Sequence, residues 1–340
     1  MVVRVAINGY GTIGKRVADA VAKQSDMRVV GVAKTRPSHE ARTAIDRGFP
    51  LFVGGAGQMT EFGVSGLPVA GTVAEMLEIA DVVVDATPDK LGRENLALYD
   101  AAKVRVVFQG GEKADVAEVS FNALANYEAA RGRRKVRVVS CNTTGLARAA
   151  AVLTQKFGVD WWDATIVRRA ADPGESKKGP INGILPTFKL PSHHGADVRT
   201  IFPDLAITTT AVVVPTTLMH VHVNHLRFTD PPKDTHALVD AFHAARRIHV
   251  FEDWERVDGT PQVMEYARDQ GNHRGDMMEN VVWAHGVRVE GNDAYFFQGI
   301  HQESIVVPEN VDAIRAMFDL APDGATSMAI TDKSLGIGRG

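Results

Sequence analysis

Short apolar runs alternate with amphipathic stretches over the first 140 residues of the chain. The short runs, rich in β-branched residues, predict strands, and the stretches with helical periodicity predict helices. The predicted strands are Val3–Ile7, Arg28–Ala33, Asp81–Ala86, Val104–Phe108 and Val136–Ser140, and the predicted helices are Ile13–Lys23, Val73–Ile79, Gly92–Ala102 and Phe121–Ala130. Because strands that alternate with helices form a parallel sheet covered on both faces, this region is predicted to be a parallel α/β domain.

Two long polar segments interrupt the hydrophobic pattern. Phe52–Gly66, rich in glycine, is predicted to be an irregular insertion. Ala171–Asp197 contains four prolines, four glycines and two adjacent histidines. A loop of this length inside a compact domain is usually functional, so its polar residues are candidates for a site.

The pattern changes after residue 141. We expect a helix over Leu146–Phe157, a strand over Trp161–Arg169, antiparallel strands within Ile207–Leu226 and Val281–Gln298, and an amphipathic C-terminal helix over Pro308–Leu320. The fold class is therefore predicted to be α/β, with an N-terminal parallel sheet and an α+β second domain built on an antiparallel sheet.

A chain of 340 residues is long enough for two domains, since a domain usually has roughly 150 residues. The first is predicted to span residues 1–140 and to be completed by the C-terminal helical segment 303–340. The second is predicted to span residues 141–302 and to carry the catalytic groups.

Composition narrows the class of protein. The chain is 45% hydrophobic and 23% charged, has a net charge of −3, and contains no basic tract that would favour nucleic acid. No apolar stretch approaches the ~20 residues of a membrane span, and the N-terminus enters a strand directly, without a signal peptide. A single cysteine excludes an intrachain disulfide. We expect a cytoplasmic protein that binds neither nucleic acid nor membrane.

A glycine-rich turn follows the first predicted strand. Gly9, Gly11 and Gly14 supply the spacing G-x-G-x-x-G between a strand and a helix. The three glycines allow a tight turn, a close approach of a pyrophosphate and close packing of helix on strand, which is typical of a Rossmann dinucleotide site. The helix N-terminus that begins at Thr12 and Ile13 would face the phosphates. The alternative is a glycine-rich turn with no ligand.

The end of the second strand indicates which dinucleotide binds. An NAD-selective site usually carries an acidic residue there, for the ribose 2′-hydroxyl. This chain has Lys34 and Thr35 instead, followed by Arg36. A cation and a hydroxyl suit a 2′-phosphate, so we expect NADP to be accepted at least as well as NAD. The alternative is a solvated loop.

Two further strand ends are candidates for the cofactor crevice. Thr87 and Pro88 could line the adenosine side, and Gly110 and Gly111 could admit the nicotinamide ribose. An ordinary turn between strand and helix would give the same residues.

Cys141 follows the last strand of the first domain and opens a polar Asn-Thr-Thr-Gly turn. A thiol there is placed like a nucleophile, provided that a helix N-terminus or a nearby base activates it. The candidate bases are histidines. His220 and His222 lie on a later strand and share one face with Asn224, and His193 and His194 lie in the long loop. The row on the strand suits the wall of a site, but an exposed sheet face gives the same pattern.

Several motifs together resemble glyceraldehyde-3-phosphate dehydrogenase. They are the segment from Ala6 to Arg16 and the sequence Ser140-Cys141-Asn142-Thr143-Thr144-Gly145. Other segments are similar to the archaeal (type II) phosphorylating branch of the family, and the resemblance covers essentially the whole chain. These segments are Phe108–Lys113, Arg168–Pro173, Pro191–Gly195, Val214–His222, His301–Ser304 and Pro308–Asn310.

The resemblance implies a reaction at Cys141, whose thiolate would attack the aldehyde of D-glyceraldehyde 3-phosphate. His220 matches the base that the archaeal branch draws from a later strand, with His222 as the fallback, since Arg168 and Arg169 stand where the other branches carry a histidine. His220 would lower the pKa of the thiol and then accept a proton as hydride leaves for the nicotinamide. Inorganic phosphate would attack the thioester and give 1,3-bisphosphoglycerate.

The same resemblance implies two anion sites, a bound NAD or NADP and a homotetramer, and we expect no metal. The cationic and hydroxyl groups available to the two anions include Lys177, Lys178 and Thr144. Groups expected to bind substrate or phosphate are Ser140, Asn142, Thr143, Arg168, His193, His194 and Gly195, and groups expected to bind cofactor are Gly9, Gly11, Thr12, Ile13, Gly14, Lys34, Thr35, Thr87, Gly111, Arg169 and Gln302.

Two rival functions are compatible with parts of this pattern. A related semialdehyde dehydrogenase or acyl-phosphate reductase shares the cysteine and the phosphate chemistry but needs a carboxylate clamp. A nucleotide-binding regulator without catalysis is disfavoured by the intact Cys141 and by the absence of a basic patch.

Overall fold

Eight parallel strands of the N-terminal region form one sheet, in the order β4-β3-β2-β1-β5-β6-β8-β7. This is a computed structural model that describes residues 2–88, 90–109, 111–171 and 182–338. The strands are β1 (Val3–Asn8), β2 (Met27–Ala33), β3 (Leu51–Val53), β4 (Gly71–Thr72), β5 (Val82–Asp85), β6 (Arg105–Phe108), β7 (Val119–Phe121) and β8 (Lys135–Val138). The predicted parallel α/β sheet is confirmed.

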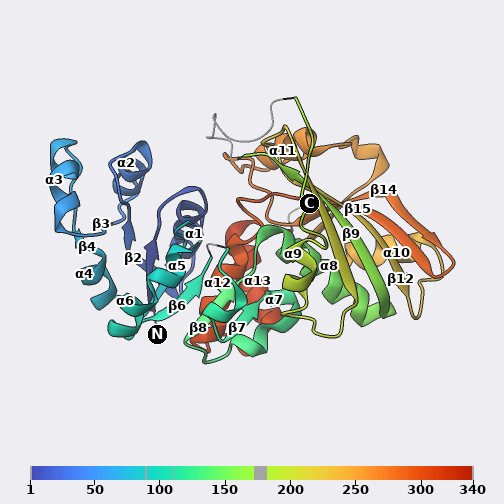
Figure 1. Ribbon diagram of the computed structural model, residues 1–340, viewed down its shortest axis with the longest axis horizontal. Helices are drawn as coiled ribbons and strands as arrows, with labels where there is room; N and C mark the ends of the chain where they lie inside the picture. The colour runs from blue at the N-terminus through green and yellow to red at the C-terminus, as the bar shows by residue number, and fades with distance from the viewer. Residues whose placement is uncertain (1, 89, 110, 172–181, 339–340) are drawn as a thin grey trace. The chain divides into compact units, whose positions relative to one another are not determined.

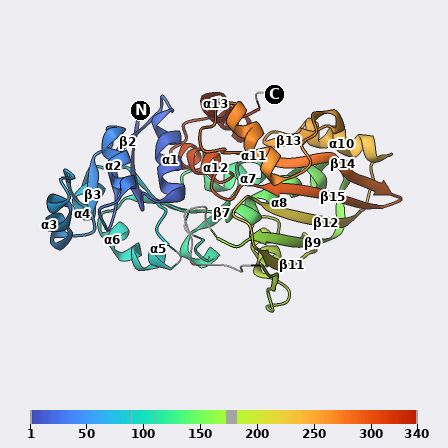
Figure 2. The ribbon, with the colours of Figure 1, turned by 90° about the horizontal axis from the view of Figure 1, so that it is seen from above.

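Helices cover both faces of this sheet (Figures 1 and 2), with α1 and α12 on one face and α4 and α6 on the other. The helices of this part are α1 (Thr12–Ala22), α2 (His39–Asp46), α3 (Ala56–Val64), α4 (Val73–Glu78), α5 (Leu91–Glu94), α6 (Leu96–Ala101), α7 (Ala123–Asn126), α12 (Val307–Met317) and α13 (Gly324–Leu335), with the 3-10 turns η1 (Ala114–Val116) and η2 (Tyr127–Ala130). The buried core between the sheet and α4 and α6 includes Met76, Val83, Tyr99 and Phe108.

Two local predictions in this region are wrong. Phe52–Gly66 is not irregular, because it contains most of β3 and all of α3. Its helical periodicity is weak: Phe62 is the one large apolar side chain of α3 that is fully buried. Phe121–Ala130 is not one helix, because it begins in β7 and continues as the short turns α7 and η2.

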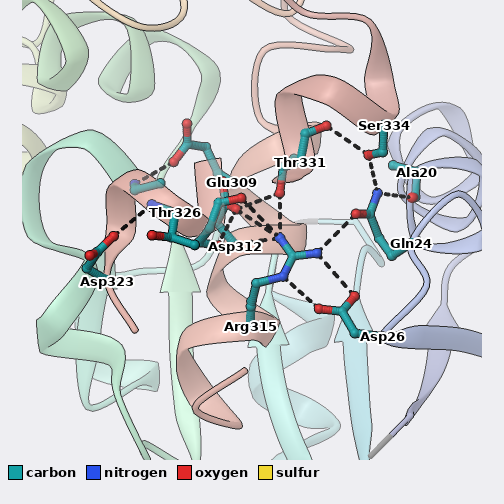
Figure 3. A network of polar contacts seen from close by, with 12 residues as sticks. Ala20, Gln24, Asp26, Glu309, Asp312, Arg315, Asp323, Thr326, Thr331 and Ser334 are labelled. Atoms are coloured by element: carbon teal, nitrogen blue, oxygen red, sulfur yellow. Dashed lines mark hydrogen bonds and ion pairs between the residues drawn. The ribbon is translucent and has the colours of Figure 1, made fainter. Parts of the chain in front are cut away.

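The C-terminal helices are attached to the first unit by a buried cation. Arg315 of α12 is fully buried, and its guanidinium donates to Asp26 Oδ2 at 2.8 Å, to Gln24 Oε1 at 3.0 Å and to Thr331 Oγ1 at 2.6 Å (Figure 3). Asp312 accepts from Thr331 as well, at 2.6 Å. Because Arg315 is fully buried, removal of its acceptors would leave a buried charge without compensation and destabilise the unit.

The chain divides into two compact units, one comprising Met1–Ser140 and Val307–Gly336 and the other Cys141–Val306 and Ile337–Gly340. The second unit has a seven-stranded sheet in the order β10-β11-β9-β12-β15-β14-β13. Its elements are β9 (Val159–Arg169), β10 (Leu185–Pro186), β11 (Ile207–Val214), β12 (His220–Phe228), β13 (Ile248–Phe251), β14 (Asn280–Glu290), β15 (Asp293–Ile300), α8 (Cys141–Phe157), α9 (His193–Val198), α10 (Thr235–His243), α11 (Thr260–Asp269) and the 3-10 turn η3 (Asp253–Glu255).

This second sheet is mixed, whereas an antiparallel sheet was predicted. β12 pairs antiparallel with β9 and β15, but β11 runs parallel to β9 and β13 runs parallel to β14. The alternation of apolar and polar residues reports which face a side chain occupies, and it carries no information on the direction of the neighbouring strand.

Candidate active site

Three strand ends meet at one end of the second sheet. β9 ends at Arg169, and its neighbour β12 begins close by, with Val221 opposite Val167. His220 lies opposite Ile300, the last residue of β15, so the segment that begins at His301 starts at the same place. The antiparallel registers therefore bring the arginine pair, His220 and residues 301–303 together.

Cys141 is the first residue of α8, so the polar turn predicted after it is instead the first turn of a helix. The thiol is half-buried, and burial raises its pKa to about 11. The backbone N–H of Asn142 and the charges of Arg169 and Arg168 act in the opposite direction. The predicted lowering of the thiol pKa is therefore not seen here, because desolvation of the thiolate outweighs the cations beside it.

Arg168 and Arg169 differ in how they are held. Arg169 is buried, pairs with Glu303 at 2.8 Å, and donates from Nε to Gln302 Oε1 at 2.9 Å. The Nε of Arg168 is buried, and no hydrogen-bond partner for it is found among the residues that the structure describes. The charge of Arg168 lowers the pKa of Cys141 and those of three histidines. This guanidinium therefore acts on all four side chains, which are Cys141, His193, His194 and His220.

His220 is buried, and its Nδ1 accepts a hydrogen bond from the backbone N–H of Arg169 at 3.0 Å. A neutral imidazole that accepts at Nδ1 carries its proton on Nε2. Burial, followed by the charge of Arg169, holds the pKa of His220 well below its usual range, so the ring is neutral at pH 7.

The polar face of β12 points into the protein. His220, His222 and Asn224 are all buried, whereas Val223 on the opposite face is 39% exposed. The alternative that these side chains lie on an exposed sheet face is excluded. The first turn of α8 packs against them. His222 Nε2 lies 2.9 Å from Asn142 Oδ1, and a Cβ added to Gly145 would lie 3.7 Å from the His222 ring.

The histidines of the long loop lie at the start of α9. His193 stacks on His194 with ring centroids 4.0 Å apart, and burial lowers the pKa of His194 to about 3. The Nδ1 of His194 lies 3.1 Å from Ser192 Oγ. Gly195 donates its backbone N–H to Thr209 Oγ1, and a Cβ there would lie 2.9 Å from the Ile207 carbonyl oxygen, so close packing on β11 requires the glycine.

The remaining predicted substrate residues have mixed environments. The hydroxyl of Thr143 donates to Asp197 Oδ2 at 2.8 Å, which connects α8 to α9. Thr144 is buried in the same first turn of α8. Ser140 is half-buried directly before Cys141. Lys177 and Lys178 lie outside the described residues.

The glycine-rich turn of the first unit has the predicted strand-turn-helix form. Gly9 has φ +100°, and a Cβ there would lie 2.7 Å from the backbone of Ala86. A Cβ on Gly14 would lie 1.9 Å from the Gly9 carbonyl oxygen, whereas a Cβ on Gly11 would meet nothing within 4 Å. Protein packing therefore requires the first and third glycines, and the second leaves open space at the N-terminus of α1, next to Thr12 and Ile13.

The other predicted cofactor residues are partly engaged within the protein. Lys34 pairs with Glu40 at 2.6 Å, with both side chains less than one-fifth exposed, while Thr35 is exposed. Thr87 donates its backbone N–H to Asp85 Oδ1 at 2.9 Å. Gly111 has φ +85° and open space around its Cα, and Gly110 lies outside the described residues. Glu40 lies on α2, beyond the strand end that usually carries the acidic residue, so the sequence did not single it out.

Among the described residues, no helix is both long and apolar enough to cross a bilayer, and no group of three or more His, Cys, Asp or Glu side chains is arranged to hold a metal ion.

Comparison with known proteins gives matches over the whole chain. The family described as "Glyceraldehyde 3-phosphate dehydrogenase, C-terminal domain" matches residues 140–283, and the family "Dihydrodipicolinate reductase, N-terminus" matches residues 3–122. The chain is 51% identical to a protein of Halobacterium salinarum, over 98% of this chain and 100% of the relative. It is 50% identical to a protein of Thermococcus kodakarensis and 47% identical to one of Methanobrevibacter smithii, each over at least 98% of both chains. All three relatives are named glyceraldehyde-3-phosphate dehydrogenase.

Proposed function

The chain belongs to the glyceraldehyde-3-phosphate dehydrogenase family, and on that premise we propose that it oxidises D-glyceraldehyde 3-phosphate reversibly, with NAD or NADP and inorganic phosphate, to 1,3-bisphosphoglycerate. One observation carries the proposal most strongly. In a chain that matches these relatives along its full length, the only cysteine begins a helix within the field of two arginines.

The turn between β1 and α1 fits a dinucleotide. A Cβ at Gly11 would occupy otherwise open space beside a helix N-terminus, which is where a pyrophosphate binds. Gly9 and Gly14 shape the turn, Thr12 and Ile13 offer backbone N–H groups, and Lys34 with Thr35 would bind a 2′-phosphate. Thr87, Gly111, Arg169 and Gln302 are proposed as further cofactor contacts. When bound, the nicotinamide would supply the acceptor for the hydride of the substrate.

Cys141 supplies the nucleophile. Its sulfur forms a bond to the aldehyde carbon, the carbonyl electron pair moves to oxygen, and the thiol proton ends on that oxygen, which becomes a hydroxyl group. Because burial raises the pKa of the thiol to about 11, little thiolate exists at neutral pH, and proton removal must accompany the attack. Arg168 and Arg169 stabilise the negative charge that develops on the sulfur as the proton leaves. The backbone N–H of Cys141 and the Asn142 amide are proposed to bind the oxyanion.

His220 is proposed to accept the proton of the hydroxyl group as hydride leaves the carbon. The vacant proton position on its neutral ring is Nδ1, which accepts the hydrogen bond from Arg169. Accepting a proton there means giving up that bond and leaving a buried N–H group without its acceptor, at a cost of about 1–3 kcal/mol. General-base catalysis typically provides roughly 10²–10⁴-fold in rate, or about 3–5 kcal/mol, which offsets this cost.

Two anions must be bound, the phosphate of the substrate and the phosphate that attacks the thioester. Arg168 is the best-placed cation, because its Nε has no hydrogen-bond partner within the described part of the chain. His193, His194 and the Gly195 segment of α9, with Ser140 and Thr143, are proposed as the remaining contacts. By resemblance to the family, we further propose a homotetramer that acts in the cytoplasm.

The decisive experiment is an assay of the purified protein with glyceraldehyde 3-phosphate, inorganic phosphate and NAD or NADP. We expect phosphate-dependent reduction of the cofactor, and none with Cys141→Ser. Reduction that needs no phosphate, or none with either cofactor, would contradict the proposal. Sedimentation of the same sample tests the tetramer.

A further inference from the structure

Four buried side chains form a continuous line of hydrogen bonds that ends beside Cys141. They lie on β14, β15, β12 and at the start of α8, and none is more than 3% exposed. Asn280 Nδ2 donates to Gln298 Oε1 at 3.0 Å, Gln298 Nε2 lies 2.9 Å from His222 Nδ1, and His222 Nε2 lies 2.9 Å from Asn142 Oδ1. We call Asn280, Gln298, His222 and Asn142 the amide relay.

The direction of the amide relay is fixed by the protein backbone. Asn280 Nδ2 also contacts the carbonyl oxygen of Gly145 at 2.7 Å. A carbonyl oxygen can only accept a hydrogen bond, so Asn280 must present its N–H groups on this side. Gln298 must then accept with Oε1 and turn its NH₂ group toward His222. Every later bond in the relay inherits its direction from this one carbonyl.

The same logic sets the protonation of His222. Its Nδ1 accepts from Gln298, so the proton of the neutral ring lies on Nε2 and is donated to Asn142 Oδ1. Burial lowers the pKa of His222 to about 3, so the ring holds one proton at neutral pH. The Asn142 amide is therefore locked with its oxygen toward His222 and its NH₂ group toward the other side.

We propose that Asn280 and Gln298, acting through His222, are positioning residues that keep the Asn142 NH₂ group available to the substrate carbonyl oxygen during attack by Cys141. This inference rests on the proposed function. As the carbon–sulfur bond forms, the carbonyl electron pair moves to oxygen, and an N–H donor stabilises that charge. A flipped amide would present its own lone pairs and repel it. His222 then acts as a hydrogen-bond donor and not as a base.

A network that served stability alone would be expected to give each of its buried polar atoms a hydrogen-bond partner. The Oδ1 of Asn280 is buried, and no hydrogen-bond partner for it occurs in the described part of the chain, which costs free energy. Asn224, on the same buried face, satisfies both ends of its amide, through Trp162 Nε1 and the carbonyl oxygens of His222 and Phe296. Asn224 thus offers a matched control outside the relay.

The main test is Asn280→Asp, which reverses the relay without altering the substrate-binding residues. An ionised carboxylate donates to neither Gly145 nor Gln298, and a protonated carboxyl group has one O–H, which we expect the fixed Gly145 carbonyl oxygen to take, so Gln298 turns its NH₂ group toward the carboxyl oxygen. The Gln298 oxygen then faces His222, the ring proton moves to Nδ1, and the Asn142 amide flips. We expect kcat to fall about 100-fold with KM for the aldehyde changed much less.

Asn224→Asp places the same change on the same buried face. It is expected to lose comparable stability but to keep kcat near the wild-type value. A folded Asn280→Asp variant with wild-type kcat, or an equal loss in both variants, would overturn the proposal.

Nuclear magnetic resonance of histidine labelled with ¹⁵N reads the tautomer directly, even if activity is lost for another reason. The His222 signals, assigned by their loss in His222→Gln, should show the proton on Nε2 in the wild type and on Nδ1 in Asn280→Asp. A proton that stays on Nε2 in the variant contradicts the relay.

His222→Gln separates a donor from a base, because a glutamine amide can donate from a position near Nε2 but cannot accept a proton. We expect kcat within about tenfold of the wild type, against a loss of about 100-fold in His222→Leu. Equal inactivity of both would overturn the inference. Wild-type protein without dehydrogenase activity would instead contradict the proposed function, so the two failures are distinguishable.

Discussion

The backbone N–H of Arg169 donates a hydrogen bond to Nδ1 of His220 across 3.0 Å. The pairing of β9 with β12 holds the two residues together, at the end of one strand and the start of the other. The bond leaves the proton of the neutral ring on Nε2. His220 can therefore act as a base only by giving up its contact with Arg169.

His220→Gln tests this role. The variant keeps a side-chain N–H but cannot accept a proton, so we expect kcat to fall by about 100-fold or more. The rate of Cys141 alkylation should change little, because the charges that act on the thiol come from the arginines and from Glu303. Rapid-mixing measurement of hydride transfer checks the first expectation. Full activity of the variant would assign the base elsewhere.

The alkylation of Cys141 should rise steeply with pH. The pKa of the thiol is raised to about 11, so the thiolate fraction should grow about tenfold per pH unit between about pH 7 and 9.5, without a plateau. Iodoacetamide labelling followed by mass spectrometry measures the rate, and Cys141→Ser is the blank because the chain has no other cysteine. Arg168→Met should slow the reaction, since a cation that favours the thiolate is lost. A plateau below about pH 8 would show that the thiol is already activated.

Gly14→Ala should lower stability, whereas Gly11→Ala should weaken dinucleotide binding. A methyl group on Gly14 would lie 1.9 Å from the Gly9 carbonyl oxygen, so we expect a loss of about 2 kcal/mol in the free energy of unfolding. A methyl group on Gly11 meets open space, so stability should change by less than about 0.5 kcal/mol while KM for the dinucleotide rises. Urea unfolding and cofactor titration measure the two effects. An unchanged KM in Gly11→Ala would contradict the proposed pyrophosphate site.

The Lys34–Glu40 pair should control the choice between NADP and NAD. Lys34→Asp removes the cation proposed to bind the 2′-phosphate, and we expect kcat/KM for NADP relative to NAD to fall about tenfold or more. Glu40→Gln frees Lys34 from its partner at 2.6 Å and should raise the same ratio. Steady-state kinetics with both cofactors provides the measurement. If the ratio is unchanged in Lys34→Asp, the 2′-phosphate is recognised by other residues.

Much of the first unit could be predicted from local sequence. The runs around Val5 and Val83 are continuous, β-branched and bounded by glycine or polar residues, which favours buried parallel strands whatever surrounds them. The segment 52–66 could not be predicted in this way, since its glycines disfavour a helix and one buried phenylalanine gives too weak a period.

The amino-acid sequence by itself determined the strand-turn-helix at Gly9–Gly14 and the place of Cys141 after the last strand of the first unit. Both depend on residues that are neighbours along the chain, so backbone sterics and short-range periodicity suffice. Alternation along β12 likewise showed that His220 and His222 share a face.

Only the tertiary structure decided which face of β12 is buried and what each histidine does there. α8 covers the polar face, so His222 contacts Asn142 and, through Gln298, Asn280, residues that are far apart in sequence. The tautomer of each ring follows from hydrogen bonds that form only when those strands pair. The pKa of Cys141 is decided in the same way, because burial and the arginines beside it are properties of the packed unit.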